Sequence, residues 1–537
     1  MKKSIILLSS ICLLGLSSCA NKLDITPTNN ITDEQIQDLL ANGTDEEVEL
    51  VMGSMANGMP QRFRSNGING IGASDLRYYD IQGLDFMRCL SGNDMVYGTV
   101  TTSGFGSEQY KFINIRNSDQ TAVSTYWYWA WANITAANKM LFYLEDEAVV
   151  NAKASLQKYR AWGLVVRAYS YNFLMENYQD AYLLGGSEKL GIMLYDTYNP
   201  SQENKARSSA KETFDFIKKD INEAITLLNA AGVGYTADKT DIDMAVAKFV
   251  LARVSLNIGD WSTAISACND IMNQYTTFIP EAAYGGKNTG TVEEPAFIPE
   301  DNAFLNNEVN PEAILGWPVG EGLTTYAYWL NCFGSRFSGG STTTYARIDN
   351  RLYEQIAEQD FRKDAFMSED FGDYVYEPDF QTMFIPVYTN TKFAATQGIG
   401  TTDKTKANTV TDCYMRMSEV LLMKADAEAQ SGNETAAKAT LNQLLAARTR
   451  TGATALTCDT YPAMQGLSAL QMVQLQTRIE MWGEKGLEYY NNKRWGIPVD
   501  RTSSSTHVEK GGYSVAQMTL QIPDDEMFYN PLCVQNN

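Results

Sequence analysis

The sequence predicts a mainly α-helical fold built on tetratricopeptide-like helical hairpins with long loop insertions between them. The clearest hairpin covers residues 414–450, which read YMRMSEVLLMKADAEAQSGNETAAKATLNQLLAARTR. Gly432 marks a turn between two apolar-periodic halves, and Ala425 and Ala437 place small side chains where two helices pack closely. Residues 245–275 repeat this arrangement. Because the hairpins do not recur at a fixed period, we interpret them as diverged units separated by insertions.

Apolar residues recur at helical spacing in several other segments. A helix is expected to start after Thr32, because threonine caps helices and acidic residues follow it in the first turn. Residues 58–106 are rich in Gly, Asn, Ser and aromatics and are expected to be irregular. The further predicted helices cover residues 46–55, 120–144, 154–178, 210–228 and 478–496, the last of them breaking at Gly496.

The largest insertion, residues 278–411, is rich in Gly, Pro, Thr and aromatic residues. It carries one short helical island over residues 346–366. Loops of this length within a compact protein are usually functional or disordered, and the aromatic content of this one argues against disorder. The insertion is therefore the first place to look for a binding site.

The overall charge limits the classes of partner. The chain has 537 residues, a formal net charge of −21 and a sequence pI of about 4.6. Such an acidic chain repels phosphate backbones, which argues against nucleic acid as a partner. It also argues against electrostatic docking on anionic lipid. Membrane attachment would have to be covalent or through a protein partner.

The N-terminus reads MKKSIILLSSICLLGLSSC. Two lysines precede the apolar run Ile5–Leu16, which is too short to span a bilayer as a stable helix. The final LSSC matches a lipobox, so residues 1–18 are expected to be a lipoprotein signal peptide and Cys19 the lipidated residue. An ordinary signal peptide with a chance cysteine is the alternative. Residues 19–32 then form a polar tether, and acyl chains supply the membrane affinity.

Sequence signatures of catalysis are largely missing. There is no GxSxG, HExxH or Walker motif, and a GINGIGASD stretch lacks the third glycine of a phosphate loop. Three glutamates fall at i, i+4 and i+8 of the predicted 478–496 helix, and paired carboxylates could serve a glycosidase. The simpler interpretation is a solvated face with ion pairs to Lys485 and Arg494. The three are Glu480, Glu484 and Glu488.

Metal and cofactor chemistry has little support in the sequence. The cysteines beyond the leader are scattered without a CxxC pair, so free thiols are expected for most of them. His507 is the only histidine, and its neighbours show no metal-ligand spacing. No cofactor and no metal site are expected.

Aromatic residues are abundant, with 30 Tyr, 21 Phe and 9 Trp. Those at helical spacing are assigned to the core: Trp127, Trp131, Tyr171 and Trp482. Flat rings in loops suit the apolar faces of sugar rings, and nearby polar groups can bind the hydroxyls. The alternative is that these loop rings form a hydrophobic cluster of their own. The candidate ligand platform consists of Tyr97, Trp317, Tyr326, Tyr328, Trp329, Phe333 and Arg336.

An ordered set of short motifs resembles the SusD/RagB family of surface nutrient-binding lipoproteins. After the lipobox come SGNDM, WYWAWANITAANKML, NPEAILGW, an Asp-x-Arg turn at Asp360 and Arg362, YMRMSEVLLMKADAEAQSG, RIEMWGEKG with a later KRWG, and IPDDEMFYNP. Each motif is weak, but their order is specific. One departure is Leu487, which stands where the family often has an arginine.

This resemblance implies a SusD-like α-helical fold with tetratricopeptide-like units as its scaffold. It divides the chain into an N-terminal helical region at 33–277, a loop-rich insertion at 278–413 with the candidate ligand site, and a C-terminal region at 414–537. It also implies a lipid-anchored protein on the outer face of the outer membrane. Such a protein binds a glycan and delivers it to a SusC-like TonB-dependent transporter, with no bond broken.

Three alternatives remain open. The first is a peptide-binding member of the same family, the second is a surface glycosidase, and the third is a scaffold that binds only protein. The family's ligand residues lie in variable loops, so the candidate platform is an inference from loop aromatics.

Overall fold

The computed structural model describes most of the chain as one helical body with short strand pairs. The described residues are 32–63, 81–97, 107–288, 297–298, 302–318, 346–376, 381–393 and 411–536. Their helices are α2 (Asp33–Asn42), α3 (Asp45–Ala56), α4 (Ile81–Leu90), α5 (Ser107–Tyr110), α6 (Thr121–Phe142), α7 (Glu147–Ala152), α8 (Ala154–Tyr178), α9 (Ala210–Ala230), α10 (Met244–Ile258), α11 (Trp261–Met272), α13 (Asn350–Tyr353), α14 (Met417–Gln430), α15 (Glu434–Ala447), α16 (Ala469–Glu480), α17 (Leu487–Trp495) and α18 (Asp524–Tyr529).

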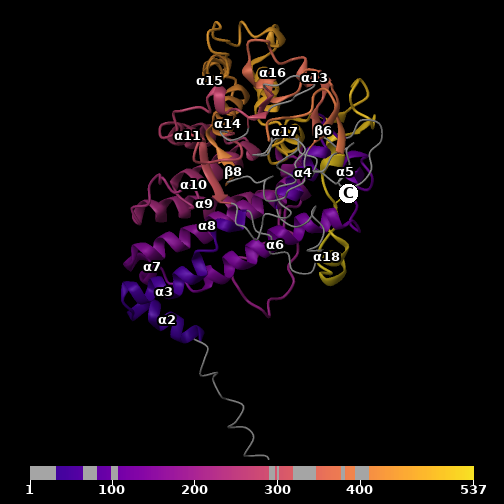
Figure 1. Cartoon of the computed structure of the whole chain (residues 1–537). Helices are drawn as coiled ribbons and strands as arrows, with labels where there is room; N and C mark the ends of the chain where they lie inside the picture. The colour runs from indigo at the N-terminus through magenta and orange to yellow at the C-terminus, as the bar shows by residue number, and fades with distance from the viewer. Residues whose placement is uncertain are drawn as a thin grey trace, which may run out of the picture.

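The helices pack in an order that nearly follows the chain. Helix α8 packs between α6 and α9, α10 packs on α9 and α11, and α14 packs on α11, α15 and α16. In Figure 1 the long helices α6, α8 and α9 lie below α14, α15 and α16. Stacked helical hairpins of this kind form a continuous core in which each unit covers its neighbour.

Both hairpins predicted from the sequence are present. Gly259 joins α10 to α11 with φ of +78°, and Gly432 lies between α14 and α15 with φ of +85°. This left-handed conformation suits glycine and ends a helix cleanly. Asp260 and Asn433 then accept a backbone N–H and start the second helix of each hairpin. The predicted mainly α-helical class is confirmed.

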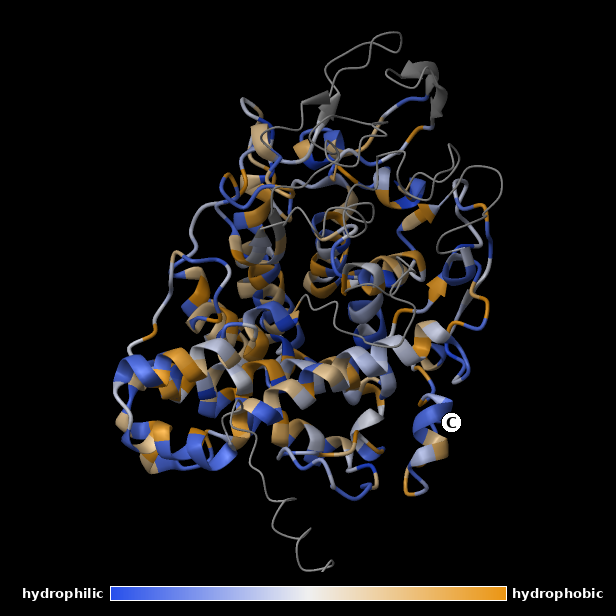
Figure 2. Ribbon diagram, turned by 60° about the horizontal axis from the view of Figure 1, so that its bottom comes forward, coloured by the Kyte–Doolittle hydropathy of each residue, from blue (hydrophilic) through white to orange (hydrophobic). Residues whose placement is uncertain are grey.

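The other long helices also match their predictions. Helices α6, α8 and α9 lie within a few residues of the predicted bounds, and α2 starts after Thr32 with a capping box. The four rings assigned to packing lie in two hydrophobic clusters, with Trp127, Trp131 and Tyr171 in the first and Trp482 in the second. Figure 2 shows apolar residues along the packed helices of the body.

Two helix predictions are wrong. Residues 58–106 were expected to be irregular, but they include the helix α4. In the sequence, neighbouring glycines and polar residues obscure the apolar residues of this helix. The expected single helix at 478–496 is two helices, α16 and α17. Gly483, Lys485 and Gly486 separate them with φ values of +74°, +52° and +63°, which no right-handed helix accommodates. The predicted end at Gly496 is confirmed.

The strands form separate antiparallel pairs. The pairs are β1 (Met95–Tyr97) with β5 (Ala346–Ile348), β2 (Lys287–Asn288) with β3 (Phe297–Ile298), β4 (Ala313–Pro318) with β8 (Thr411–Arg416), β6 (Phe371–Tyr376) with β7 (Gln381–Ile385), and β9 (Val499–Asp500) with β10 (Gly512–Tyr513). The predicted helical island at 346–366 holds only one turn of α-helix, α13, between a strand and a 3-10 helix. None of the helices in the described ranges is long and apolar enough to cross a bilayer.

Candidate functional site

The predicted ligand platform falls mainly on residues that the structure does not describe. Two of its members are described, and both rings are buried, with 0% of Tyr97 and 3% of Trp317 exposed. The Tyr97 ring lies 5.9 Å from that of Phe86, and the Trp317 ring lies 5.5 Å from that of Tyr414. These two rings therefore belong to the core and are not exposed ligand-binding rings. The members outside the described residues are Tyr326, Tyr328, Trp329, Phe333 and Arg336.

The two strands that carry these rings each pair with another strand next to an aromatic-rich segment. Tyr97, at the end of β1, pairs with Ala346 at the start of β5. Pro318, at the end of β4, pairs with Thr411 at the start of β8. The two described residues that flank the 319–345 segment, Pro318 and Ala346, therefore belong to two different strand pairs. The scaffold fixes the two ends of the 319–345 segment independently.

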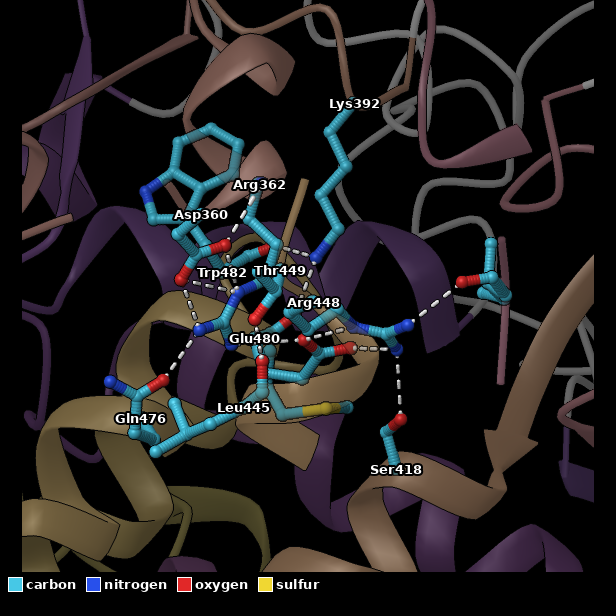
Figure 3. Close-up of polar contacts among 12 residues, drawn as sticks. Asp360, Arg362, Lys392, Ser418, Leu445, Arg448, Thr449, Gln476, Glu480 and Trp482 are labelled. Atoms are coloured by element: carbon cyan, nitrogen blue, oxygen red, sulfur yellow. Dashed lines mark hydrogen bonds and ion pairs between the residues drawn. The ribbon is translucent and has the colours of Figure 1, made fainter. Parts of the chain in front are cut away.

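A buried group of charged side chains lies at the base of the β4–β8 pair. We call it the arginine–glutamate cluster: Glu312, Arg362, Arg416, Arg448, Glu480 and Glu484. Most of its side chains are 0–2% exposed and Glu484 is 11% exposed. Figure 3 shows Arg362 and Arg448 converging on Glu480 from different elements.

Glu480, the last residue of α16, is the centre of this cluster. One of its oxygens accepts hydrogen bonds from Arg416 at 2.8 Å and Arg448 at 2.8 Å. The other accepts from Arg448 at 3.0 Å and Arg362 at 3.1 Å. Burial alone would raise the pKa of Glu480, but the three guanidinium groups hold that pKa well below its usual value. Glu480 is therefore ionised at neutral pH.

Glu312 ties the start of the strand pair to the same centre. It directly precedes β4, and its carboxylate accepts from Arg416 at 2.9 Å and Arg448 at 2.6 Å. Arg416 is the last residue of β8, so this contact closes the base of the pair. The Glu312 carboxylate also accepts the backbone N–H of Ile279, where the insertion begins.

Two further parts of the insertion reach the cluster. Arg362 pairs with Asp360 in the Asp-x-Arg turn and donates to Gln476. Lys392 donates to the carbonyls of Glu480 and Trp482, each at 2.9 Å, and to Glu484 at 2.6 Å. Burial lowers the pKa of Lys392 to about 8, although the carboxylate of Glu484 opposes this. The cluster thus binds the insertion to the α16–α17 connection at several points.

This arrangement overturns the interpretation of Glu480, Glu484 and Glu488 as one solvated helix face. The break between α16 and α17 separates them, and Glu480 and Glu484 point into the buried cluster. The expected partners are also different. Lys485 pairs with Glu419, and Arg494 pairs with Asp426.

Glu480 is not suited to act as a general acid. A general acid needs a carboxyl group that holds its proton near neutral pH, and the arginines keep Glu480 ionised. Burial, and then the carboxylate of Asp94, raises the pKa of Glu488 to about 7. Glu488 nevertheless accepts the backbone N–H of Asn93 at 2.9 Å and the amide of Asn492 at 2.7 Å, which gives it a structural role.

The single histidine is also structural. His507 is 2% exposed, with Nδ1 at 2.7 Å from the Tyr110 hydroxyl and Nε2 at 2.8 Å from the Asn93 carbonyl. Burial lowers its pKa well below the usual value, so the ring is neutral. Within the described ranges, no group of three His, Cys, Asp or Glu side chains could hold a metal ion. Four described cysteines are free thiols: Cys89, Cys268, Cys458 and Cys533.

A second surface feature lies near the C-terminus. Large apolar side chains are exposed on and after α18, with 78% of Phe528 and 72% of Tyr529 exposed, followed by Leu532 and Val534. Arg207 donates to the carbonyls of both Leu190 and Val534, which places the exposed Leu190 beside this group. Acidic residues at the start of α18 border it. We call these five apolar residues the C-terminal apolar patch.

Comparisons with known proteins agree with this fold. A family model described as "SusD family" matches residues 319–536, and one described as "Starch-binding associating with outer membrane" matches residues 93–256. No curated protein sequence matches the chain.

Solved structures similar to the chain cover almost all of it. A SusD superfamily protein from Bacteroides thetaiotaomicron is 18% identical with a TM-score of 0.68, over 91% of this chain and 99% of that one. A SusD-like carbohydrate binding protein from Bacteroides vulgatus is 17% identical with a TM-score of 0.68, over 90% and 96%. A SusD superfamily protein from Bacteroides fragilis is 18% identical with a TM-score of 0.65, over 90% and 98%.

The stacked helical hairpins and the two family matches define a SusD-like protein. One of the two matching family models is described as starch-binding and associated with the outer membrane. The chain belongs to the SusD/RagB family, as its ordered motifs indicated.

Proposed function

We propose that this protein captures a glycan at the outer face of the outer membrane and delivers it to a SusC-like TonB-dependent transporter, without catalysis. The observation that carries the proposal is the match of residues 93–256 to a family described as starch-binding and outer-membrane-associated. The match of residues 319–536 to the SusD family covers the predicted ligand segment as well.

The ligand site that we propose is the aromatic segment around Trp329. The residues that flank it lie on paired strands, and the arginine–glutamate cluster fixes one of these pairs, β4 with β8, to the helical scaffold. A rigid base of this kind is what a binding loop needs to hold aromatic rings in one orientation. Tyr97 and Trp317 belong to the core and are not part of the proposed site.

The proposed membrane attachment follows from the N-terminal sequence. Residues 1–18 are the leader, Cys19 carries the acyl chains, and residues 19–32 are the tether that precedes α2. An acidic chain is not attracted to anionic lipid, and a lipid anchor attaches it to the membrane without electrostatic attraction to the bilayer.

The C-terminal apolar patch is our candidate contact for the transporter. Exposed apolar side chains that gather in one patch often mark an interaction surface, whereas single exposed apolar residues are common on any protein. The acidic start of α18 beside it fits a partner that presents an apolar groove with a basic rim. Co-purification of the transporter is expected with the wild type and not with Phe528→Ser combined with Tyr529→Ser.

Isothermal titration of the chain from Ala20 onward against polysaccharides, oligosaccharides and peptides tests the glycan-binding proposal. We expect binding to one glycan class, and Trp329→Ala should weaken it at least about tenfold, because the variant loses the apolar burial of the ring as well as roughly 0.5–1.5 kcal/mol of ring contact. Phe528→Ala is the matched control, since it removes an exposed ring that is not part of the 319–345 segment.

The other outcomes separate the alternatives. Binding of peptides in place of glycans would favour a peptide-binding member of the family. Release of new reducing ends from the glycan would show a glycosidase. Binding that Trp329→Ala leaves unchanged would retain the function and refute the proposed site.

A further inference from the structure

A groove lies at the end of the helical body where Figure 1 shows α2, α3 and α7. It has a volume of about 930 Å³ and is open to solvent along one side. One wall is α3, and the other is the junction of α7 and α8 at residues 152–155. A space this large and open suits a segment of another protein better than a small molecule, which needs enclosure.

The groove follows α3 along its whole length. The lining residues of α3 recur at helical spacing and form one stripe: Asp45, Glu46, Glu49, Leu50, Gly53, Ser54 and Asn57. Because a helix of 12 residues is about 18 Å long, the stripe offers about three turns of contact. Val48, Met52 and Ala56 lie on the opposite side of α3 and pack into the core. The stripe is therefore the outward face of this helix.

An apolar side chain stands on this outward face. Leu50 is 76% exposed, although it lies within a helix that packs on the body. Gly53 beside it and Ala152 and Ala154 across the groove have little or no side chain, so the backbone of a partner can come close. A single exposed leucine is ordinary on a protein surface. Here it lines a groove, where an apolar side chain of a partner can bury it.

The rim of the groove is acidic. Residues 32–57 contain no lysine or arginine, and their acidic residues are Asp33, Glu34, Asp38, Asp45, Glu46, Glu47 and Glu49. Among the described residues that line the groove, Lys153 is the one cation. It lies 3.4 Å from Asp45 and donates to the carbonyl of Gly43 at 2.7 Å. The groove therefore attracts a positively charged partner and repels both anionic lipid and the same acidic face of a second copy.

We propose that this groove docks an amphipathic helix of another protein. The apolar side chains of that helix cover Leu50, and its lysines or arginines pair with the carboxylates of Asp45, Glu46 and Glu49. A helix that lies in a groove through apolar anchors one turn apart is a recurring mode of recognition. The groove shares no residue with the C-terminal apolar patch or with the segment around Trp329, and its role does not depend on glycan binding.

Fluorescence anisotropy on the chain from Ala20 onward tests the proposal. The probe is a labelled peptide of leucine and lysine, about 14 residues long and patterned as an amphipathic helix. The control peptide has glutamate in place of each lysine. Leu50→Ser removes the exposed apolar side chain, and Glu46→Lys reverses one charge of the rim. Glu188→Lys is the matched control, because it makes the same charge change at an exposed residue outside the groove.

We expect the leucine–lysine peptide to bind and the leucine–glutamate peptide not to bind. Leu50→Ser should weaken binding about tenfold or more, because the peptide no longer buries a leucine. Glu46→Lys should weaken it about threefold or more, because an attraction becomes a repulsion. Glu188→Lys should bind as the wild type does, and so should Phe528→Ser combined with Tyr529→Ser. Thermal unfolding confirms that each variant is folded.

The proposal is overturned if the leucine–lysine peptide does not bind, if the leucine–glutamate peptide binds equally well, or if both groove variants bind normally. Loss of binding in the variant with Phe528→Ser and Tyr529→Ser would place the peptide on the C-terminal apolar patch and also overturn it. So would binding to phosphatidylglycerol vesicles in preference to the peptide, since the occupant would then be a lipid surface.

Discussion

Replacing Glu480 with Gln should be among the most destabilising single changes in this protein. The substitution removes the negative charge at the centre of three buried guanidinium groups and keeps nearly the same volume. The new amide also turns an N–H₂ group toward arginine donors, where the carboxylate oxygens accepted four hydrogen bonds. The loss is therefore electrostatic and not a packing defect.

The expected cost follows from what remains. Breaking a buried ion pair by removing one partner costs about 3–5 kcal/mol, because the other charge stays buried without compensation. Three arginines share Glu480, but Glu312, Glu484 and Asp360 still hold them in part. We therefore expect about 3–5 kcal/mol, a large part of the roughly 5–15 kcal/mol that stabilises a typical domain.

Urea unfolding followed by circular dichroism measures this cost. The matched control is Glu358→Gln, which removes the same charge from an 81% exposed carboxylate that pairs with Lys363. A surface pair of this kind contributes about 0–1 kcal/mol. The reasoning is refuted if Glu480→Gln unfolds within about 1 kcal/mol of the wild type.

Three further changes test other parts of the fold. Gly486→Ala should lower the free energy of unfolding clearly more than Gly466→Ala. Both positions have positive φ, so each alanine adds about 1–2 kcal/mol of backbone strain, but a Cβ at 486 would also lie 2.3 Å from Cβ of Arg88. Equal melting temperatures of the two variants would contradict this. Lys493→Met should flatten the pH dependence of stability. Burial lowers the pKa of Lys493 to about 7 in the folded protein, whereas the same amine in the unfolded chain keeps its proton up to about 10.5. The wild type should therefore gain stability relative to Lys493→Met as the pH rises from about 7. If the stabilities of the two proteins change in parallel from pH 6 to 9, the amine stays charged in the folded protein. Ser209→Ala should cost about 1 kcal/mol by removing the capping box of α9, measured by thermal unfolding, and no loss would mean that the cap is dispensable.

The sequence allowed the helical scaffold to be predicted because its signals are local. Apolar periodicity places α6, α8 and α9, and a glycine with positive φ marks each hairpin turn. The break between α16 and α17 was missed because the glutamates of GEKG and its neighbours keep helical spacing through it. The backbone at the break has positive φ at Gly483, Lys485 and Gly486, and Gly486 packs closely against Arg88 on α4, a contact between distant parts of the chain.

The arginine–glutamate cluster could not be predicted for the same reason. Its members come from residues 312 to 484, and no local pattern shows that Glu312 and Glu480 share Arg416 and Arg448. The Asp-x-Arg turn was the one visible signal. Among the predicted platform residues, Tyr97 and Trp317 were taken for loop residues because short strands in a polar, aromatic-rich stretch have too few residues to show alternation.

We propose that this protein binds a glycan through the segment around Trp329 and leaves it intact. One calorimetric titration of the chain from Ala20 onward with the glycan that binds best, alongside Trp329→Ala and Phe528→Ala, tests it most directly. We expect binding that Trp329→Ala weakens at least about tenfold and Phe528→Ala leaves unchanged, with the glycan recovered at its original length. A glycan that is shortened, or no glycan binding by a folded wild type, would contradict it.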